Sequence, residues 1–360
     1  MWYLPKPTDK DLSDYVTYMS AKIKNTAEYA ALQGDFECDI KGHHYDFVDM
    51  LLEAKPQCQL ALNRFLMKRL FNNPHYAEGD IDELTKAVAK RKTAQTKGRQ
   101  PNLTVREQQI IATYEHRTKQ LRKVFDYSKF ISKDADFSYT LSHVKETNAC
   151  PYCNRQYTLT IEKKTRAGEV VDHIAKPHFD HWFAKTTFPL LSLSFYNLVP
   201  SCSVCNSSIK GSTLMQINNH MHPYCQERGY EPSFKFRVLF TGDKDFELYT
   251  TKSKIAAEEQ MKKDFFIEDA YKYHEQLEVA DLVKMYREHE ETYLKKWMKA
   301  TLRDLLPTKS VSEIIRMVFG AEINAGHLND RPMSKLKKDL LEQFHIIDHN
   351  GNIHPELIGE

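Results

Sequence analysis

The chain has 360 residues, of which 41% are hydrophobic and 11% aromatic, enough apolar material for packed cores in two or three domains. Glycine (12) and proline (14) are sparse, which excludes a disordered or low-complexity chain. The formal net charge is only +2, so a nucleic-acid surface would require local clustering of basic residues. The N-terminus lacks the apolar segment of a secretory signal, and no run of ~20 apolar residues is present. We expect a cytoplasmic protein without a membrane partner.

Residues 1–147 have the pattern of a helical N-terminal region. Apolar residues recur at helical spacing from Leu60 to Leu70, and the sequence Asn-Asn-Pro at 72–74 predicts the end of that helix. Thr104 and Glu107 have the spacing of a capping box ahead of another helix. Basic residues gather at 86–123, around an expected loop at 97–101. This basic segment could follow DNA phosphates or form a solvated face, and the sequence leaves both open.

The C-terminal half is expected to contain a hairpin followed by helices. Apolar and polar residues alternate over 234–240 and a turn follows, which predicts a β-hairpin extension within 216–254. Residues 255–360 return to helical periodicity. In that region Ser310 and Glu313 predict a capped helix.

Four of the seven cysteines form two pairs with two residues between partners, Cys150–Cys153 and Cys202–Cys205. Each pair is expected to lie in a tight turn that points two sulfurs at one place. Two such turns complete a tetrahedral sulfur site of the kind that holds structural Zn²⁺. A redox role is disfavoured because no βαβ pattern surrounds either pair. The long gap between the pairs requires an inserted substructure.

The residues inside and after that gap follow a specific order. Asp180-His181 is followed by Asn197-Leu198-x-Pro200, by the second cysteine pair, and then by Asn206 and Lys210. This order resembles the zinc-knuckle branch of the HNH, or ββα-metal, endonucleases. The resemblance implies an α+β fold: a mostly helical protein with an inserted ββα-metal, treble-clef-like core at 148–215, stapled by zinc on the four cysteines.

The resemblance also implies a role for each polar residue of the core. His181 would be the general base, and Asp180 and Asn206 would hold a catalytic Mg²⁺ or Mn²⁺. Asn197 would fix the loop that orients His181. Lys185 and Lys210 would contact phosphate. The last position of the motif is Asn206 rather than histidine, a variant that favours an oxygen-ligated Mg²⁺.

A competing Asp-His pair, Asp172-His173, lies just upstream. We favour Asp180-His181 because its shorter distance to Asn197 fits a single hairpin better.

Three other histidines have less specific positions. His178 alternates with Asp180 on the expected strand, and it is either a neighbour of the metal ligands or an ordinary surface residue. We expect His220 and His222 on the polar surface.

The expected function is therefore a metal-dependent HNH endonuclease that hydrolyses DNA phosphodiester bonds. Outside the core, the arrangement is similar to HNH proteins found beside ATPases in prokaryotic antiphage defence, such as the Septu-type and retron-linked nucleases, which implies a partner ATPase. Two alternatives stay open. One is a non-catalytic, zinc-stapled DNA-binding or scaffold protein, and the other is an HNH nuclease that cleaves RNA or tRNA.

Overall fold

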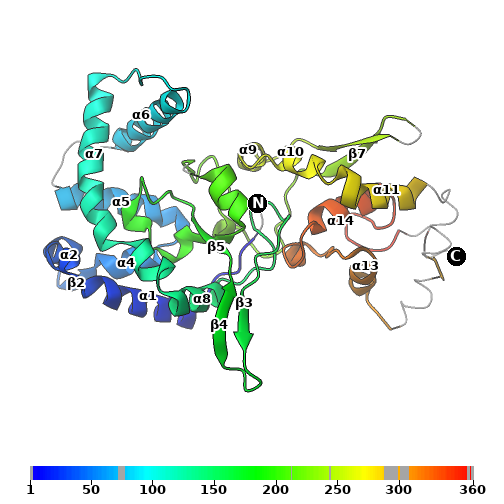
Figure 1. Ribbon diagram of the computed structural model, residues 1–360, viewed down its shortest axis with the longest axis horizontal. Helices are drawn as coiled ribbons and strands as arrows, with labels where there is room; N and C mark the ends of the chain where they lie inside the picture. Colours follow the sequence, from blue (N-terminus) through cyan, green and yellow to red (C-terminus); the bar gives the residue numbers. More distant parts are fainter. Residues whose placement is uncertain are drawn as a thin grey trace.

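The computed structural model describes residues 3–71, 78–211, 213–242, 245–287, 299–300, 308–354 and 357. About half of the chain is helical, and the described strands form small two-stranded antiparallel sheets, so the predicted α+β class is confirmed. The molecule is elongated, with the N-terminal helices at one end and the C-terminal helices at the other (Figure 1). No helix among the described residues is both long enough and apolar enough to cross a bilayer.

The N-terminal part consists of helices and one small hairpin: α1 (Asp9–Lys24), α2 (Ala27–Ala30), α3 (Gln33–Phe36), β1 (Glu37–Ile40), β2 (His43–Asp46), α4 (Phe47–Glu53), α5 (Pro56–Phe71), α6 (Glu78–Thr96), α7 (Val105–Val124), η1 (Ser128–Ser132) and α8 (Ala135–Val144). The capping box predicted at Thr104 and Glu107 is present at the start of α7. Helix α5 covers the predicted apolar run, and the predicted stop at 72–74 lies outside the described residues.

Helices α6 and α7 enclose the predicted basic segment and form a pair that projects from the body (Figure 1). Cross-helix ion pairs join Lys90 to Glu107 at 3.1 Å and Arg91 to Glu115 at 2.6 Å. Several of the basic side chains therefore hold the two helices together. Contact of this segment with DNA stays a prediction.

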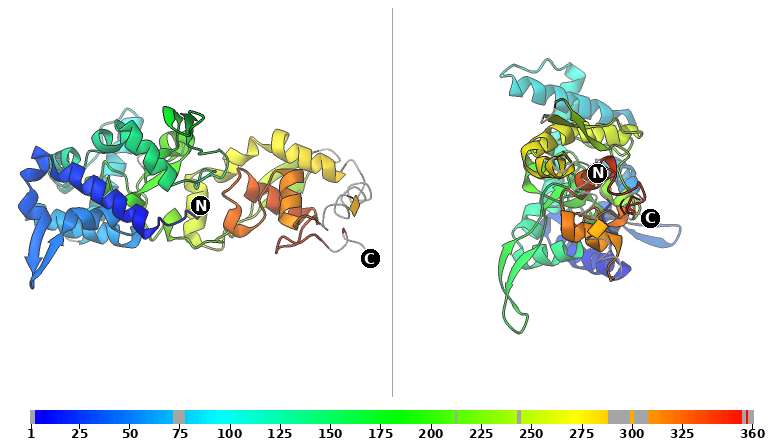
Figure 2. Two further views of the ribbon diagram at one scale, coloured as in Figure 1. Left: turned by 90° about the horizontal axis from the view of Figure 1, so that it is seen from below. Right: turned by 90° about the vertical axis from the view of Figure 1, so that its right-hand side faces the viewer.

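The central part contains β3 (Ile161–Lys164), β4 (Val170–Ala175), β5 (His178–His181), η2 (Pro189–Leu191), η3 (Phe195–Asn197), β6 (Leu198–Ser201) and η4 (Val204–Lys210). Strands β3 and β4 form a hairpin that extends away from the body (Figures 1 and 2). Strand β5 pairs antiparallel with β6, with His181 opposite Leu198, and the short helix η4 follows β6 directly. The order here is strand, buried loop, strand, helix.

The buried loop between β5 and β6 is held by the N-terminal helices. The Tyr15 hydroxyl donates to the Leu193 carbonyl at 2.6 Å, and the Ser194 hydroxyl donates to the Leu51 carbonyl at 2.5 Å. Leu190 and Phe195 are buried in the same core. The N-terminal region therefore forms the scaffold behind this loop.

The C-terminal part contains η5 (Pro223–Cys225), β7 (Phe236–Phe240), β8 (Phe246–Thr250), α9 (Ala256–Asp264), α10 (Ile267–Lys272), η6 (Glu275–Val279), α11 (Ala280–Arg287), α13 (Val311–Phe319), η7 (Ala325–His327) and α14 (Ser334–Gln343). The predicted hairpin is present as β7 and β8, although part of its turn lies outside the described residues. Helix α13 has the predicted capping box and ends at Gly320, whose φ of 63° suits glycine.

A buried ionic network joins α14 to β7. The Lys335 ammonium donates to Asp339 at 2.7 Å and to Glu231 at 2.8 Å. Asp339 also accepts the backbone N–H of Phe236 at 3.0 Å. Because buried charges require such partners, the network fixes how α14 sits against the hairpin.

The prediction that His220 and His222 lie on the polar surface was wrong. His222 is 1% exposed and packs against the Trp182 ring, with 4.7 Å between centroids. His220 is 9% exposed and pairs with Asp264 at 3.0 Å. The polar sequence around these residues concealed the burial that tertiary packing creates.

Candidate functional site

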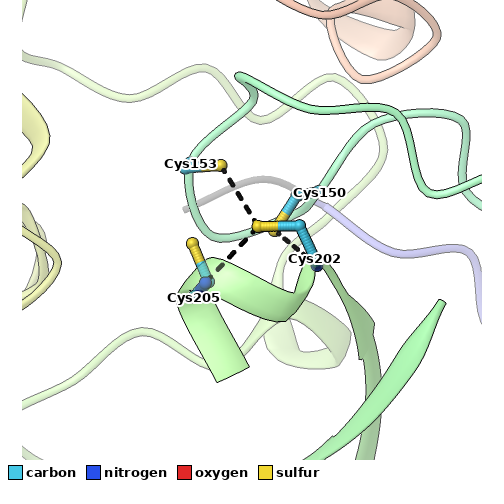
Figure 3. A group of neighbouring side chains, drawn as sticks. All are labelled: Cys150, Cys153, Cys202 and Cys205. Carbon is cyan, nitrogen blue, oxygen red and sulfur yellow. Dashed lines mark hydrogen bonds between the residues drawn. The ribbon is translucent and has the colours of Figure 1, made fainter. Parts of the chain in front are cut away.

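The two cysteine pairs come together in the fold, as Figure 3 shows. Cys150 and Cys153 lie in a turn before β3, and Cys202 and Cys205 lie at the junction between β6 and η4. All four are buried, and their sulfurs lie within 4.8 Å of one another. The Cys153 and Cys202 sulfurs are 4.0 Å apart, much too far for a disulfide, whose S–S bond is about 2.05 Å.

This geometry fits a tetrahedral metal ion. A Zn–S bond of ~2.3 Å places the sulfurs of a regular tetrahedron about 3.8 Å apart. Backbone N–H groups already point at the sulfurs, because Cys202 N lies 3.4 Å from the Cys150 sulfur and Cys205 N lies 3.4 Å from the Cys202 sulfur. Such donors stabilise thiolates, the form that binds metal. The four cysteines could therefore hold a structural metal such as Zn²⁺.

The C-terminal part of the chain packs on the first cysteine pair. The Tyr271 hydroxyl donates to the Cys153 carbonyl at 2.7 Å, and Met333 N donates to the Asn154 carbonyl at 2.7 Å. The Tyr152 ring stacks on Phe265 with 4.6 Å between centroids. The sulfur site thus lies where the central and C-terminal parts meet.

A pocket of about 440 Å³ opens beside the β5–β6 pair. Four of the residues predicted for the site line it: Asp180, His181, Lys185 and Asn206. Its wall is completed by Tyr127, Ser132, Lys176, Pro177, His178, Phe179, Ala184, Thr186 and Gly211. The fold therefore gathers residues from β5, from the loop after it, from η4 and from the N-terminal region.

Asp180 lies deep in the pocket wall and is 2% exposed. Its Oδ2 accepts a hydrogen bond from the Tyr152 hydroxyl at 2.6 Å, and its Oδ1 lies 3.1 Å from the Lys210 ammonium. Burial raises the pKa of the Asp180 carboxyl, while Lys210 and Tyr152 oppose that rise. Since Tyr152 stands between Cys150 and Cys153, the sulfur site and this carboxylate are physically connected.

His181 has one ring nitrogen fixed by the backbone. Its Nε2 lies 3.0 Å from the Ser192 carbonyl, which only accepts, so Nε2 carries the proton. In the neutral ring the lone pair is then on Nδ1. Burial lowers the pKa of His181 to about 3, and the nearby Lys185 adds to this, while the bond to Ser192 opposes it. The Tyr127 ring meets the imidazole edge-on at 4.5 Å between centroids.

Asn197 closes the loop that follows His181. Its Oδ1 accepts the Phe183 N–H at 2.7 Å, and its Nδ2 donates to the carbonyls of Phe183 at 3.1 Å and Leu191 at 2.8 Å. The side chain is completely buried. Because Leu191 precedes the residue that binds His181, these bonds set the position of the imidazole.

Asn206 and His178 face each other across the pocket mouth. Asn206 is half-buried near the start of η4, and His178 is exposed on β5. The Asn206 Nδ2 and His178 Nδ1 atoms are 3.3 Å apart. His178 is thus a surface histidine that also lines the pocket, and its place beside catalytic-metal ligands stays a prediction.

The two lysines predicted to contact phosphate differ in position. Lys185 lines the pocket, whereas the Lys210 side chain is 1% exposed. The Lys210 ammonium donates to Asp180 and to the His181 carbonyl at 2.7 Å. In this structure Lys210 therefore neutralises Asp180 from behind the pocket and is not available to a phosphate.

The competing pair lies elsewhere. Asp172 and His173 are on β4, in the projecting hairpin, and neither lines the pocket. His173 Nε2 lies 2.9 Å from Asp136, Nδ1 lies 3.3 Å from Glu162, and the ring stacks on Tyr139. The pair at 172–173 is thus engaged with α8 and β3.

The residues missed from the sequence include Tyr127 and Lys176, which line the pocket, and Tyr152, which donates a hydrogen bond to Asp180. Tyr152 had a local signal, since it stands inside a cysteine pair, but nothing in the sequence connects it to Asp180. Tyr127 lies in the N-terminal region and reaches the pocket only through tertiary packing.

Comparisons with protein-family models, with curated proteins and with solved structures gave no match to this chain. The HNH resemblance therefore stays a prediction from the residues themselves.

Proposed function

We propose that this chain is a metal-dependent endonuclease of the HNH type that hydrolyses phosphodiester bonds of DNA. One observation carries the proposal: Asp180, His181 and Asn206 line one pocket at an antiparallel strand pair that leads straight into a helix. The four-cysteine cluster lies at the junction of that second strand and the helix. This order of two strands, a helix and a cysteine cluster supports the proposal, because the resemblance to ββα-metal nucleases implies the same order.

In the proposed site, each residue has a distinct task. The Nδ1 lone pair of His181 accepts a proton from the attacking water, and an approaching phosphate anion would raise the pKa of the imidazole toward a useful value. The oxygens of Asp180 and Asn206 would hold Mg²⁺ or Mn²⁺, and such an ion supplies charge stabilisation for the leaving oxygen. Lys210 favours the ionised form of Asp180 against the effect of burial, and Asn197 holds the loop in place.

The oxygen donors fit a hard divalent ion in type. Each Asp180 oxygen accepts one hydrogen bond and keeps a further lone pair. Asn206 offers an amide oxygen at the pocket mouth. A DNA substrate, a partner ATPase and a place in antiphage defence are proposed from the sequence resemblance.

One observation favours the non-catalytic alternative, a zinc-stapled scaffold. Both Asp180 oxygens already have donors inside the protein, so the carboxylate also makes sense as a purely structural anion. The two functions predict different results for removal of the imidazole at position 181. A nuclease should lose cleavage of nucleic acid, whereas a scaffold has no cleavage to lose.

The test is cleavage of supercoiled plasmid, single-stranded DNA and RNA by the zinc-loaded chain with added Mg²⁺ or Mn²⁺. We expect His181→Ala to abolish nicking while keeping zinc content and fold. His173→Ala is the matched control, because it removes the histidine of the competing Asp-His pair, and it should cut as well as wild type. Equal cutting by His181→Ala and wild type would refute the proposed site. Cleavage of RNA alone would favour the RNA-cleaving alternative.

A further inference from the structure

Two lysines on opposite sides of His178–His181 in the sequence, Lys176 and Lys185, line the same pocket. The Lys176 ammonium lies 4.9 Å from the centre of the Phe179 ring, and the Lys185 ammonium lies 4.7 Å from the centre of the Tyr127 ring. Aromatic faces hold cations in place without neutralising them. Across the described parts of the chain, neither ammonium has a carboxylate oxygen within 4.0 Å.

The charges around the pocket do not balance. Lys176 and Lys185 line the pocket and Lys210 lies behind its wall, whereas among the described residues that line the pocket only Asp180 carries a carboxylate, which is paired with Lys210. Burial lowers the pKa of Lys176 and of Lys185, and for Lys185 the more distant Asp126 partly opposes this. Such lowering is expected where cations leave water without a counter-ion. An anion in the pocket would relieve it.

The same imbalance disfavours a divalent cation that arrives alone. Asp180 is already paired with Lys210, so a metal ion would meet the field of Lys176 and Lys185 with little negative charge to offset it. A phosphate group supplies that negative charge.

We propose that the pocket is an oxyanion site in which Lys176 and Lys185 hold a backbone phosphate of a nucleic-acid strand before any divalent ion is bound. The identification of the anion as substrate backbone rests on the proposed function, whereas the anion site itself rests on the lysines. Aromatic support of both lysines fixes their ammonium groups at the pocket wall, and the volume of about 440 Å³ is within the range of pockets that enclose small ligands.

The test measures binding without divalent ions. The full-length, zinc-loaded chain is titrated with inorganic phosphate and with a six-residue thymidine oligonucleotide, in buffer passed over a chelating resin. We expect both to bind to wild type. Lys176→Gln and Lys185→Gln should each weaken oligonucleotide binding about tenfold, the effect of losing one charge-assisted contact. Each should also reduce the slope of log affinity against log salt by about 0.7.

Lys163→Gln is the matched control, because Lys163 is an exposed lysine of β3 that does not line the pocket, and its affinity should stay within twofold of wild type. Lys185→Arg keeps the charge and should restore binding, which separates loss of contact from misfolding. Zinc content is measured for every variant.

Three results would overturn the inference. In the first, wild type binds neither ligand without divalent ions, and in the second, the pocket and control variants lose oligonucleotide affinity equally. The third result is a wild type that binds inorganic phosphate but not the oligonucleotide. Failure of the proposed function has a different signature. In that case the lysine variants lose metal-free binding as expected, but His181→Ala cuts like wild type or nothing is cut.

Discussion

Removal of the Lys210 ammonium should destabilise the protein through the charge that it leaves behind. The side chains of Lys210 and Asp180 are 1% and 3% exposed, and the Lys210 ammonium lies 3.1 Å from the Asp180 carboxylate. In Lys210→Met, Asp180 retains only the Tyr152 hydroxyl as a donor, and the His181 carbonyl loses its partner. Breaking a buried ion pair from one side costs about 3–5 kcal/mol. Protonation of Asp180 limits the loss, since burial already raises the pKa of its carboxyl.

A double-mutant cycle also needs the variant Asp180→Asn. It leaves the Lys210 ammonium without a carboxylate partner and should lower the free energy of unfolding by a similar amount. The double variant contains neither buried charge. Its loss should therefore be smaller than the sum of the single losses by about 2–3 kcal/mol, as expected for coupled neighbours.

The assay is urea unfolding of zinc-loaded proteins, followed by tryptophan fluorescence, since Trp182 is completely buried and stands two residues after Asp180 in the chain. The coupling should change little between low and high salt, because a buried pair is poorly screened. Losses that add within about 0.5 kcal/mol would refute the reasoning, since that is the behaviour of independent sites.

Three further predictions concern stability. Burial lowers the pKa of His222 to about 3 from the ordinary 6.5, so the unfolded chain binds the proton at a higher pH than the folded chain does. The free energy of unfolding therefore falls as the pH drops from 6.5 toward 3, and at pH 5 the loss from His222 is about 2 kcal/mol. Between pH 8 and pH 5, His222→Phe should lose about 2 kcal/mol less stability than wild type. Cys202→Ser should lose the bound metal and unfold at much lower urea concentration, because a structural zinc supplies folding energy; metal analysis should find one zinc per wild-type chain, and an unchanged midpoint would contradict the site. Asn197→Ala should cost at least about 3 kcal/mol, because it leaves buried backbone groups of Phe183 and Leu191 without partners; a loss under 1 kcal/mol would mean that water replaces the amide.

Local features of the sequence predicted much of the secondary structure. The capping boxes at Thr104 and Ser310 are confirmed, as are the hairpin at 236–250 and the helical run from Pro56. These features depend on residues a few positions apart, so their physical causes are visible in the chain itself. The two cysteine pairs belong to the same group, because each turn is local and the sulfurs gather as expected.

The pocket could be predicted only in part. The motif around Asp180, His181 and Asn206 supplied three of its residues, and the structure brings them to one pocket. Lys210 carries no sequence signal that separates a phosphate contact from an internal counter-ion. Only its burial against Asp180 decides between the two.

The sequence by itself determined the capped helix starts, the hairpin at 236–250, where the sulfurs gather, and which short motif carries the polar residues, but not the hairpin of β1 and β2 within the region expected to be helical. Tertiary structure alone decided that His222 is buried, that Tyr152 connects the cysteine cluster to Asp180, and that Tyr127 reaches the pocket from the N-terminal region. The physical reason is the distance along the chain over which each kind of interaction acts. Capping and turn geometry act over a few residues, whereas burial and charge pairing depend on which distant segments are packed together.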